Sequence, residues 1–331
     1  MTQVSKKRKR LRMWLLIIAT VLVGLLVTAW VLITQPLFSG IETIAVPPVD
    51  PARLETHVRM LAETFFPRNE THPENLDRAA DYIGQEFKQA AGRVSEQPYQ
   101  AWGKTYRNVM ALFGPEAKER IVIGAHYDTA GEQPGADDNA SGVAGLIELA
   151  YLFGHTPPPM CVELVAFTLE EPPSFRENHM GSAVHAASLK QQGIQVRAMF
   201  SLEMIGYFSD APGSQAFPNP VLKLVYPSTG NFIAVVSKLD HGSLVRRVKS
   251  AMRGATSLPV YSINAPRQLP GIDFSDHLNY WNAGYDAVMI TDTSFYRNAR
   301  YHTRQDKPET LDYQRMAMVV QGVYAAALAL K

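Results

Sequence analysis

The chain becomes strongly apolar at Arg120-Ile121-Val122-Ile123-Gly124-Ala125, and the polar residues His126 and Asp128 follow directly. A short apolar run of this composition predicts a buried strand. The pattern then continues as a predicted helix over 142–153 and a second predicted strand over 162–169. This alternation is typical of βαβ units, in which parallel strands lie side by side under a layer of helices.

Further elements are predicted on both sides of this unit, and the alternation of strand and helix continues on its carboxyl-terminal side. The other predicted elements are helices over 50–66, 74–91, 182–192, 243–253 and 311–330, and strands over 94–99, 107–113, 198–202 and 287–291. We therefore expect an α/β fold with a mixed, largely parallel central sheet and helices on both faces. The length of the segment 50–331 suits a single α/β domain.

The amino-terminal segment has a different character. Six Lys and Arg residues within 6–12 precede an unbroken apolar stretch over 13–33. At 1.5 Å per residue, a helix of this length spans about 30 Å, the thickness of the hydrocarbon core of a bilayer. Trp14 and Trp30 lie near the two ends of the stretch, where indole rings favour the membrane interface.

These features predict a basic cytoplasmic tail over 1–12, a single-pass transmembrane anchor over 13–34 and a linker over 35–49. Because basic residues tend to stay in the cytoplasm, we expect the domain over 50–331 to lie outside it, in the periplasm or at the cell surface of a bacterium. A cleaved signal peptide is the alternative, but its apolar region would be shorter and would end in small residues. The lipid bilayer is thus an expected partner.

Bulk composition narrows the remaining classes of function. The formal net charge is +1, so no overall charge signature of nucleic-acid binding exists, and no nucleic-acid partner is expected. The single cysteine, Cys161, cannot form an internal disulfide and is expected to be a buried apolar residue. Hydrophobic residues make up 46% of the chain, enough for a large core.

Polar residues follow the predicted strands where each strand ends. His126 ends the first strand, Glu170 and Glu171 end the second, and Glu203 ends the strand over 198–202. Ligands of open α/β sheets bind outside the carboxyl ends of the strands. We therefore expect these four side chains to meet in one site.

Two further residues extend this set. Asp138 lies beside Asp137 in a loop that opens onto a helix, where one aspartate could cap the helix and the other could bind metal. His302 lies in a polar loop and joins the set only because of the other members. Mixed imidazole and carboxylate ligands suit zinc, and two zinc ions if one carboxylate bridges them.

The Glu pair and Asp128 have expected roles around the metals. Asp128 could accept the second ring N–H of His126 and so fix the tautomer of that ligand. Adjacent carboxylates at the end of an apolar strand repel each other unless a cation or proton compensates. One of Glu170 and Glu171 is therefore expected to bind metal, while its neighbour accepts a proton from the attacking water.

A serine mechanism is not expected. The run Ser275-Asp276-His277 contains the residue types of a catalytic triad, but consecutive residues cannot converge on one point as a triad requires.

These motifs, in this order, resemble those of the co-catalytic zinc exopeptidase family that includes bacterial leucyl aminopeptidases, glutamate carboxypeptidases and glutaminyl cyclases. The resemblance implies that one zinc ion is held by His126, Asp138 and Glu203, and the other by Asp138, Glu171 and His302. Asp138 would then be the bridging ligand.

The same resemblance, which runs from about residue 108 to 313, implies two further roles. Glu170 falls on the general base of the family, and Asp128 falls on the partner of the first histidine. A cis peptide is also implied between Asp138 and Asn139, an uncommon feature outside functional sites.

The chain departs from the family at two points. Many relatives have Asp where Glu203 stands, so the metal position or metal preference is expected to differ. The loop 172–181 is longer than the turn of many relatives and is expected to shape the substrate pocket. Asn69 and Asn139 match the glycosylation sequon, but a glycan at Asn139 would block the site.

The leading hypothesis is a membrane-anchored zinc metallopeptidase with two zinc ions that removes amino-terminal residues from peptides. One alternative is an acyltransferase with one zinc ion that cyclises amino-terminal glutamine, as glutaminyl cyclases do. The other is a non-catalytic binding protein on the same fold, although an intact ligand set with its base argues against it. Side-chain preference and the end of the peptide attacked stay open at this point.

Overall fold

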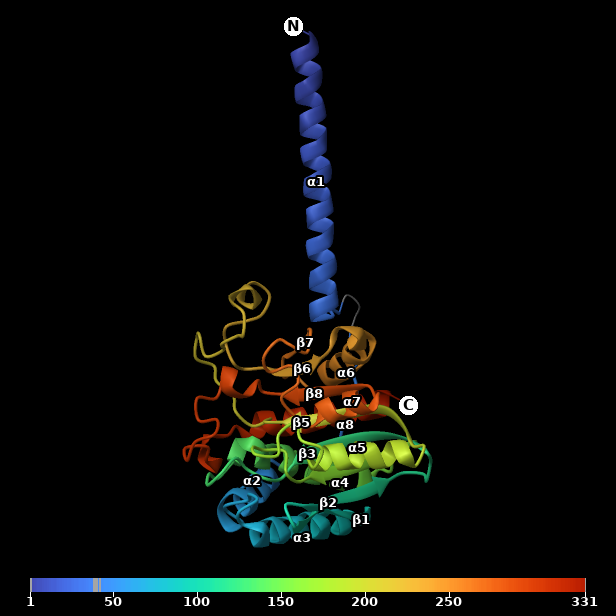
Figure 1. The fold of residues 1–331 in the computed structure, drawn as a ribbon, viewed down its shortest axis with the longest axis vertical. Helices are drawn as coiled ribbons and strands as arrows, with labels where there is room; N and C mark the ends of the chain where they lie inside the picture. Colours follow the sequence, from blue (N-terminus) through green and yellow to red (C-terminus); the bar gives the residue numbers. More distant parts are fainter. Residues whose placement is uncertain (1, 38–40, 42, 331) are drawn as a thin grey trace.

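The computed structural model describes residues 2–37, 41 and 43–330, with side chains from Lys7 onward. Gly40 of the expected linker and the side chain of Lys6 lie outside this description. One eight-stranded sheet organises the domain, in the order β1-β2-β4-β3-β5-β8-β6-β7 (Figure 1). Its strands are β1 (Arg93–Ala101), β2 (Lys104–Phe113), β3 (Glu119–His126), β4 (Cys161–Phe167), β5 (Gln195–Glu203), β6 (Ile233–Ser237), β7 (Val260–Asn264) and β8 (Ala287–Thr291).

The centre of the sheet is parallel and its two margins contain antiparallel pairs. β3 pairs in parallel with both β4 and β5, and β5 pairs in parallel with β8. β1 and β2 form an antiparallel hairpin that continues antiparallel onto β4. On the other margin, β6 runs antiparallel to β8 and parallel to β7. The expected mixed, largely parallel sheet is therefore confirmed.

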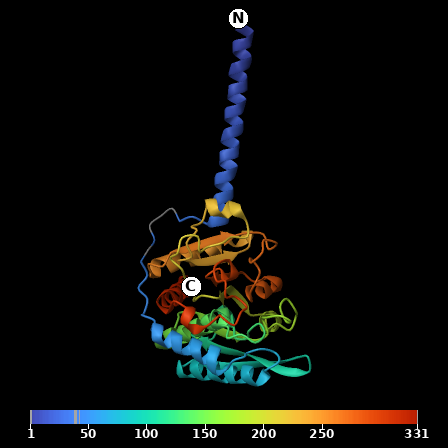
Figure 2. The ribbon, with the colours of Figure 1, turned by 90° about the vertical axis from the view of Figure 1, so that its left-hand side faces the viewer.

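Helices cover both faces of the sheet, as expected. They are α2 (Pro51–Arg59), α3 (Pro73–Gln89), α4 (Gly142–His155), α5 (Gly181–Gln191), α6 (Gly242–Ala255), α7 (His277–Ala283) and α8 (Tyr313–Ala329). A further helix, α1 (Thr2–Thr34), lies at the amino terminus. Side chains of α2, α3, α4, α6 and α8 join one buried apolar cluster, and those of α5 and α7 join a second cluster. Figures 1 and 2 show these two layers with the sheet between them.

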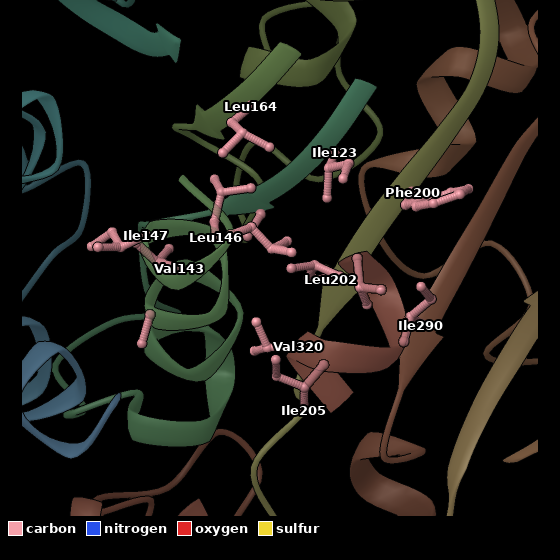
Figure 3. Close-up of a cluster of buried hydrophobic side chains, with 14 of the residues drawn as sticks. Ile123, Val143, Leu146, Ile147, Leu164, Phe200, Leu202, Ile205, Ile290 and Val320 are labelled. Carbon is pink, nitrogen blue, oxygen red and sulfur yellow. The ribbon is translucent and has the colours of Figure 1, made fainter. Parts of the chain in front are cut away.

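Successive side chains of a central strand point to opposite faces of the sheet and so contribute to both clusters. In β3, Ile121 and Ile123 belong to the α4 side and Val122 to the α5 side, as the two-residue period of a strand requires. Figure 3 shows the α4 side, where Ile123, Leu164 and Leu202 of three neighbouring strands face Leu146 of α4. All four side chains are fully buried. Because this layer is tightly filled, the carboxyl ends of the central strands are held at fixed positions.

The amino-terminal segment forms one long helix that stands away from the domain beside β7 (Figures 1 and 2). Among the described residues, one helix, Lys7–Thr34, is long and apolar enough to cross a membrane, and its side chains are exposed from Lys7 to Trp30. This helix is compatible with a membrane anchor or with a signal sequence. The carbonyl oxygen of Thr34, at its end, accepts hydrogen bonds from Lys249 Nζ and Ser262 Oγ, both at 2.7 Å.

Three elements were not among the sequence predictions. They are the short strands β6 and β7 and the two-turn helix α7. β6 and β7 extend the sheet beyond β8 toward α1, so the sheet is two strands wider than expected. Cys161 is buried at the start of β4 with a free thiol, as expected.

Candidate metal centre and active site

Three parallel strands bring four of the predicted residues to one edge of the sheet. His126 is the last residue of β3 and Glu203 the last residue of β5, and these two strands are direct neighbours. Glu170 and Glu171 follow shortly after the end of β4, which lies on the other side of β3. The structure therefore places all four side chains together, where the strand ends had predicted them.

Asp138 enters from the short turn Ala136–Ser141 that precedes α4. The Asp138-Asn139 peptide is cis, as the resemblance implies. The side chain of Asn139 fastens this turn to the end of β5, since its Nδ2 donates to Leu202 O at 2.8 Å and its Oδ1 accepts from Met204 N at 3.0 Å. Asn139 is fully buried and its amide is engaged, so its sequon is closed to glycosylation in the folded chain.

His302 reaches the same point from the loop after β8. It has a left-handed backbone conformation with φ 56°, and its ring stacks on Tyr301 at 3.7 Å between centroids. Asparagine and glycine favour this conformation more than histidine does, so the loop holds His302 in an uncommon backbone geometry. The result is an imidazole aimed at Asp138 and Glu171.

The two oxygens of Asp138 face two separate groups of side chains. Oδ1 lies 3.5 Å from Nε2 of His126, and that same nitrogen lies 3.4 Å from Oε2 of Glu203. Oδ2 lies 3.1 Å from Nε2 of His302, which in turn lies 3.2 Å from Oε2 of Glu171. Asp138 thus stands between one group of His126 and Glu203 and another of His302 and Glu171.

Several atoms in this cluster fit a metal better than they fit one another. Asp138 Oδ2, Glu171 Oε1 and His302 Nε2 are buried and make no hydrogen bond within the part of the chain that the structure describes. One potential ligand atom each from His126, Asp138 and Glu171 lies within 4.8 Å of the others. Buried polar atoms without partners are costly, and nitrogen and oxygen donors at this spacing suit zinc.

Burial and the nearby charges shift the pKa values of the four carboxyl groups in the cluster. Burial, followed by the charge of Asp138, raises the pKa of Glu171 to about 8. Burial raises the pKa of Glu170 well above its ordinary value, and it also raises the pKa of Glu203. Burial alone would raise the pKa of Asp138 as well, but its contacts with His302 and His126 lower it.

For the two histidines burial acts in the opposite direction, but the neighbouring carboxylates outweigh it and the pKa is again raised. Burial alone would lower the pKa of His302, but Asp138 and Glu171 raise it to about 10. Burial likewise opposes the charged form of His126, yet Glu203 and Glu170 raise its pKa well above the ordinary value. The cluster therefore binds protons strongly, which is the behaviour of a site with too much negative charge for its surroundings.

Asp128 contacts both the histidine and the Glu pair. Its Oδ1 and Oδ2 accept hydrogen bonds from the main-chain N–H groups of Glu170 at 3.1 Å and Glu171 at 3.0 Å. Its Oδ1 lies 3.5 Å from Nδ1 of His126, and its main-chain oxygen lies 3.3 Å from the same nitrogen. Besides its expected contact with the ring, Asp128 therefore fixes the main chain on which the expected base and ligand stand.

Two residues that sequence reasoning did not assign also hold ligands in place. Ser275 Oγ donates to Oε2 of Glu203 at 2.7 Å, while His277 turns away and contacts the main-chain oxygen of Ile272. The carboxylate of Asp306 accepts from the main-chain N–H groups of Asp137 at 3.0 Å and Asp138 at 3.1 Å. Ser275 thus holds the carboxylate of Glu203, an expected metal ligand, instead of lying in a triad with His277.

Asp137 differs from its expected role as a helix cap. Its Oδ1 accepts from Gly206 N at 3.0 Å and its Oδ2 from Asn298 Nδ2 at 2.8 Å. It is fully buried and ties the turn before α4 to two distant loops. A sequence offers no local signal for such contacts, because the partners are far away along the chain.

A fully buried arginine supports the loop after β3. Arg68 donates to the main-chain oxygens of Tyr127 at 2.8 Å, Pro134 at 3.0 Å and Gly135 at 3.0 Å. Burial lowers its pKa to about 10, although the charges of Asp128, Asp306 and Asp138 oppose that shift. It therefore adds a positive charge behind the carboxylates while bonding only to carbonyl groups.

The cluster opens into an apolar cavity of about 240 Å³. Glu170, Glu171, Glu203 and His302 line one part of it, and Phe175 of the loop 172–181 lines another. Much of the remaining wall is aromatic, contributed by Phe217, Tyr226, Phe232, Tyr261, Phe274 and Phe295. In the described part of the chain, no lysine or arginine lines the cavity.

Comparison with known proteins assigns the family. A family model described as Peptidase family M28 matches residues 108–327, more than half of the chain. The chain belongs to Peptidase family M28. It is 50% identical over 281 residues to the uncharacterized protein YfbL of Escherichia coli (strain K12), a match that covers 82% of this chain and 86% of YfbL.

More distant relatives are named as peptidases. The chain is 24% identical over 231 residues to leucine aminopeptidase 1 of Phaeosphaeria nodorum, covering 65% of this chain and 52% of that protein. It therefore spans about half the length of this relative. A probable zinc metalloprotease of Pyrenophora tritici-repentis is 32% identical over 145 residues, covering 40% of this chain and 32% of that protein.

Solved structures show the same fold. LapB from Legionella pneumophila superposes with a TM-score of 0.67 at 23% identity, covering 85% of this chain and 72% of LapB. A glutaminyl cyclase from Bacteroides thetaiotaomicron superposes with a TM-score of 0.66 at 19% identity, covering 86% of this chain and 99% of the cyclase. Family membership and the metalloprotease relatives support a zinc-dependent peptidase, with peptides as substrates.

Proposed function

We propose that the protein is a membrane-anchored aminopeptidase with two zinc ions, which removes apolar residues from the amino termini of peptides. One observation supports it most strongly: Asp138 presents its two oxygens to two different imidazoles, at 3.5 Å and 3.1 Å. A carboxylate that bridges two metals requires this arrangement. His126 and Glu203 would complete one site, and His302 and Glu171 the other.

The residues around these sites suit amide hydrolysis. Zinc, when bound, supplies a Lewis acid that polarises the scissile carbonyl and lowers the pKa of water. Glu170 is the carboxylate of the cluster left over from the two ligand groups, and its Oε2 lies 4.0 Å from Nε2 of His126. Its raised pKa suits a general base that accepts a proton from the attacking water and returns it to the leaving amine.

The charge of the cavity favours an aminopeptidase over a carboxypeptidase. A carboxypeptidase needs a cationic group to hold the terminal carboxylate of its substrate, and none of the described lining residues is a lysine or arginine. An aminopeptidase must instead hold a terminal ammonium group. The acidic cluster at the inner part of the cavity suits that group.

The apolar wall supports a preference for large apolar side chains. Phe232 and Phe274 line the cavity together with Leu269 and Ile272. A side chain of similar character would remove this surface from water on binding, which favours the complex. Leucine and phenylalanine are therefore the expected amino-terminal residues.

The test is substrate profiling of the purified full chain in detergent. A mixed peptide library would be followed by mass spectrometry with zinc and with a chelator, beside a Glu170→Gln control. We expect zinc-dependent loss of single apolar residues from amino termini, absent in the control. Loss of carboxyl-terminal residues would contradict the proposal.

The two alternatives give distinct results in the same experiment. A glutaminyl cyclase would convert amino-terminal glutamine with loss of ammonia and would contain one zinc ion per chain. A binding protein would retain zinc and leave every peptide unchanged.

A further inference from the structure

A short segment on the wall of the cavity also presents an apolar surface to the outside. The segment Gln215–Tyr226, called the lip below, contains the 3-10 helix Pro220–Leu224. Phe217, Leu222 and Tyr226 of the lip line the cavity. The lip thus has one side turned toward the candidate active site.

The other side of the lip is exposed and apolar. Leu224 is 85% exposed, Val221 62% and Val225 39%, and Lys223 lies between them. A single exposed leucine needs no explanation, but adjacent exposed apolar side chains often mark a surface that contacts another apolar phase. A lysine beside them is typical of membrane interfaces, where its apolar stem lies along the lipid and its ammonium group reaches the headgroups.

Direct contacts connect the lip to the end of α1. Ser262 Oγ donates to Thr34 O at 2.7 Å, and Tyr226 Oη donates to Ser262 O at 2.7 Å. Ser262 lies on β7, and it lines the cavity as well. One residue of β7 therefore joins the end of the apolar helix to the base of the lip.

A second set of contacts holds the domain firmly against the end of α1. Lys249 Nζ donates to Thr34 O at 2.7 Å, and Arg246 Nη2 donates to Gln35 Oε1 at 3.3 Å. Thr34 and Gln35 are both buried by these contacts. The orientation of the domain relative to α1 is therefore fixed by side chains of α6 and β7.

The figures place the lip where a bilayer surface would lie. In both Figure 1 and Figure 2, the 3-10 helix of the lip is at the level at which α1 ends. If α1 crosses a bilayer, its end at Thr34 lies at the membrane interface. The lip then lies at the same interface, while β1, at the other margin of the sheet, lies far from it.

We propose that the lip inserts its exposed apolar side chains into the outer surface of the bilayer, and that the cavity opens toward that surface. The partner is the lipid bilayer itself. The substrates are peptides held at the membrane by an apolar group of their own. This choice of substrate rests on the proposed peptidase function, whereas the insertion of the lip does not.

Insertion is tested by a fluorescent label in the full chain, reconstituted in vesicles of phosphatidylcholine and phosphatidylglycerol. Leu224→Cys would carry an environment-sensitive dye, because the natural Cys161 is buried and therefore shielded from the dye. Val94→Cys on β1 is the matched control, since Val94 is exposed and lies at the opposite margin of the sheet. We expect blue-shifted emission and strong quenching by quencher-labelled lipid at 224 only. Equal quenching at both positions would overturn the proposal.

Substrate supply is tested by two peptides with the same amino-terminal phenylalanine, one soluble in water and one carrying a carboxyl-terminal acyl chain that holds it in the vesicle. Leu224→Asp should lower kcat/KM for the vesicle-bound peptide by about tenfold, the factor expected for loss of one buried leucine side chain. It should leave the soluble peptide unchanged, because Leu224 does not line the cavity.

Val94→Asp supplies the matched control for added charge and should leave the ratio of the two rates unchanged. An unchanged ratio in Leu224→Asp as well would refute the substrate class. If the wild-type chain cleaved neither peptide, the proposed function would fail, and the quenching measurement alone would decide whether the lip inserts.

Discussion

Two acidic regions, one around Glu163 within β4 and one around Glu171 beyond its end, are equally buried. They differ in which side chains compensate the negative charge. Glu163, within β4, has a side chain 5% exposed, with Arg120 Nη1 at 3.1 Å and His185 Nε2 at 3.5 Å. Burial alone would raise its pKa, but these two partners lower it. Glu171, beyond the end of the same strand, is also 5% exposed, yet its pKa is raised to about 8.

The difference lies in the supply of positive charge. Glu163 has the guanidinium group of Arg120 and the imidazole ring of His185 as its own partners. Asp138, Glu170, Glu171 and Glu203 share two imidazoles, and no lysine or arginine forms an ion pair with them within the described chain. A carboxylate balanced inside the protein contributes to structure, whereas a cluster left unbalanced requires cations from outside.

The largest expected effect comes from the carboxylate that is not assigned to a metal. Glu170→Gln keeps the shape of the side chain but cannot accept a proton. We expect kcat for an amino-terminal leucine peptide to fall by about 10²–10⁴-fold, the range for general acid–base catalysis. Zinc content, measured by elemental analysis, should stay unchanged. Retained turnover would mean that another group removes the proton.

A smaller effect is expected from the residue that positions Glu203. Ser275→Ala removes the 2.7 Å hydrogen bond to Oε2 of that ligand. We expect zinc affinity to fall by about 10–100-fold, as for other hydrogen bonds to metal ligands. Competition with a chelator of known affinity measures this. Added zinc should restore turnover, and affinity equal to that of the wild type would remove Glu203 from the ligand set.

Substitution of Glu163 should change the stability of the fold and not the catalytic activity. Glu163→Gln leaves Arg120 and His185 facing a neutral side chain, which is expected to lower the free energy of unfolding by about 1–3 kcal/mol. Zinc content and kcat should not change. Glu119→Gln is the control, since Glu119 forms an exposed pair with Arg197 at 3.2 Å and should change stability by less than about 1 kcal/mol. A loss of activity in Glu163→Gln at unchanged stability would contradict the assignment of Glu163 to structure alone.

A smaller effect is expected in how the stability of the metal-free chain depends on pH. Folding raises the pKa of Glu171 from 4.5 to about 8, so the folded state binds this proton more tightly than the unfolded state does. The resulting stability is present at low pH and is lost as pH rises through about 8. His302, whose pKa rises from 6.5 to about 10, acts in the same direction.

We therefore expect the melting temperature of the chelator-treated chain to fall between about pH 5 and pH 8. The zinc-loaded chain should behave in the opposite way over this range, because protons compete with the metal for its ligands. Identical profiles with and without zinc would show that the cluster does not exchange protons for metal.

Much of the fold could be predicted because the central strands are apolar and regularly spaced. The strand over 287–291 agrees with β8 in both bounds. β7 was missed because Val260–Asn264 is short and only alternately buried, and α7 because seven residues show too little helical period. Both elements depend on tertiary contacts: β7 pairs in parallel with β6, and Asn279 Nδ2 of α7 donates to Ser182 Oγ at 2.9 Å.

The residues of the site also fall into those that the sequence could predict and those that it could not. The strand-end residues could be predicted since position in the sheet fixes them, and the structure brings them together with Asp138 and His302. The supporting residues could not be predicted. Asp306 lies 168 positions from Asp138, and Arg68 bonds only to main-chain oxygens. No local pattern marks a residue whose partners come from elsewhere in the fold.

The most direct test is the zinc content of the purified full chain, measured by elemental analysis after loading with zinc and removal of the excess. We predict two zinc ions per chain in the wild type and in Glu170→Gln, and fewer in Glu171→Ala and His302→Ala. A wild-type chain that retained no zinc, or the same content in all four proteins, would contradict the assignment of this cluster as a metal centre.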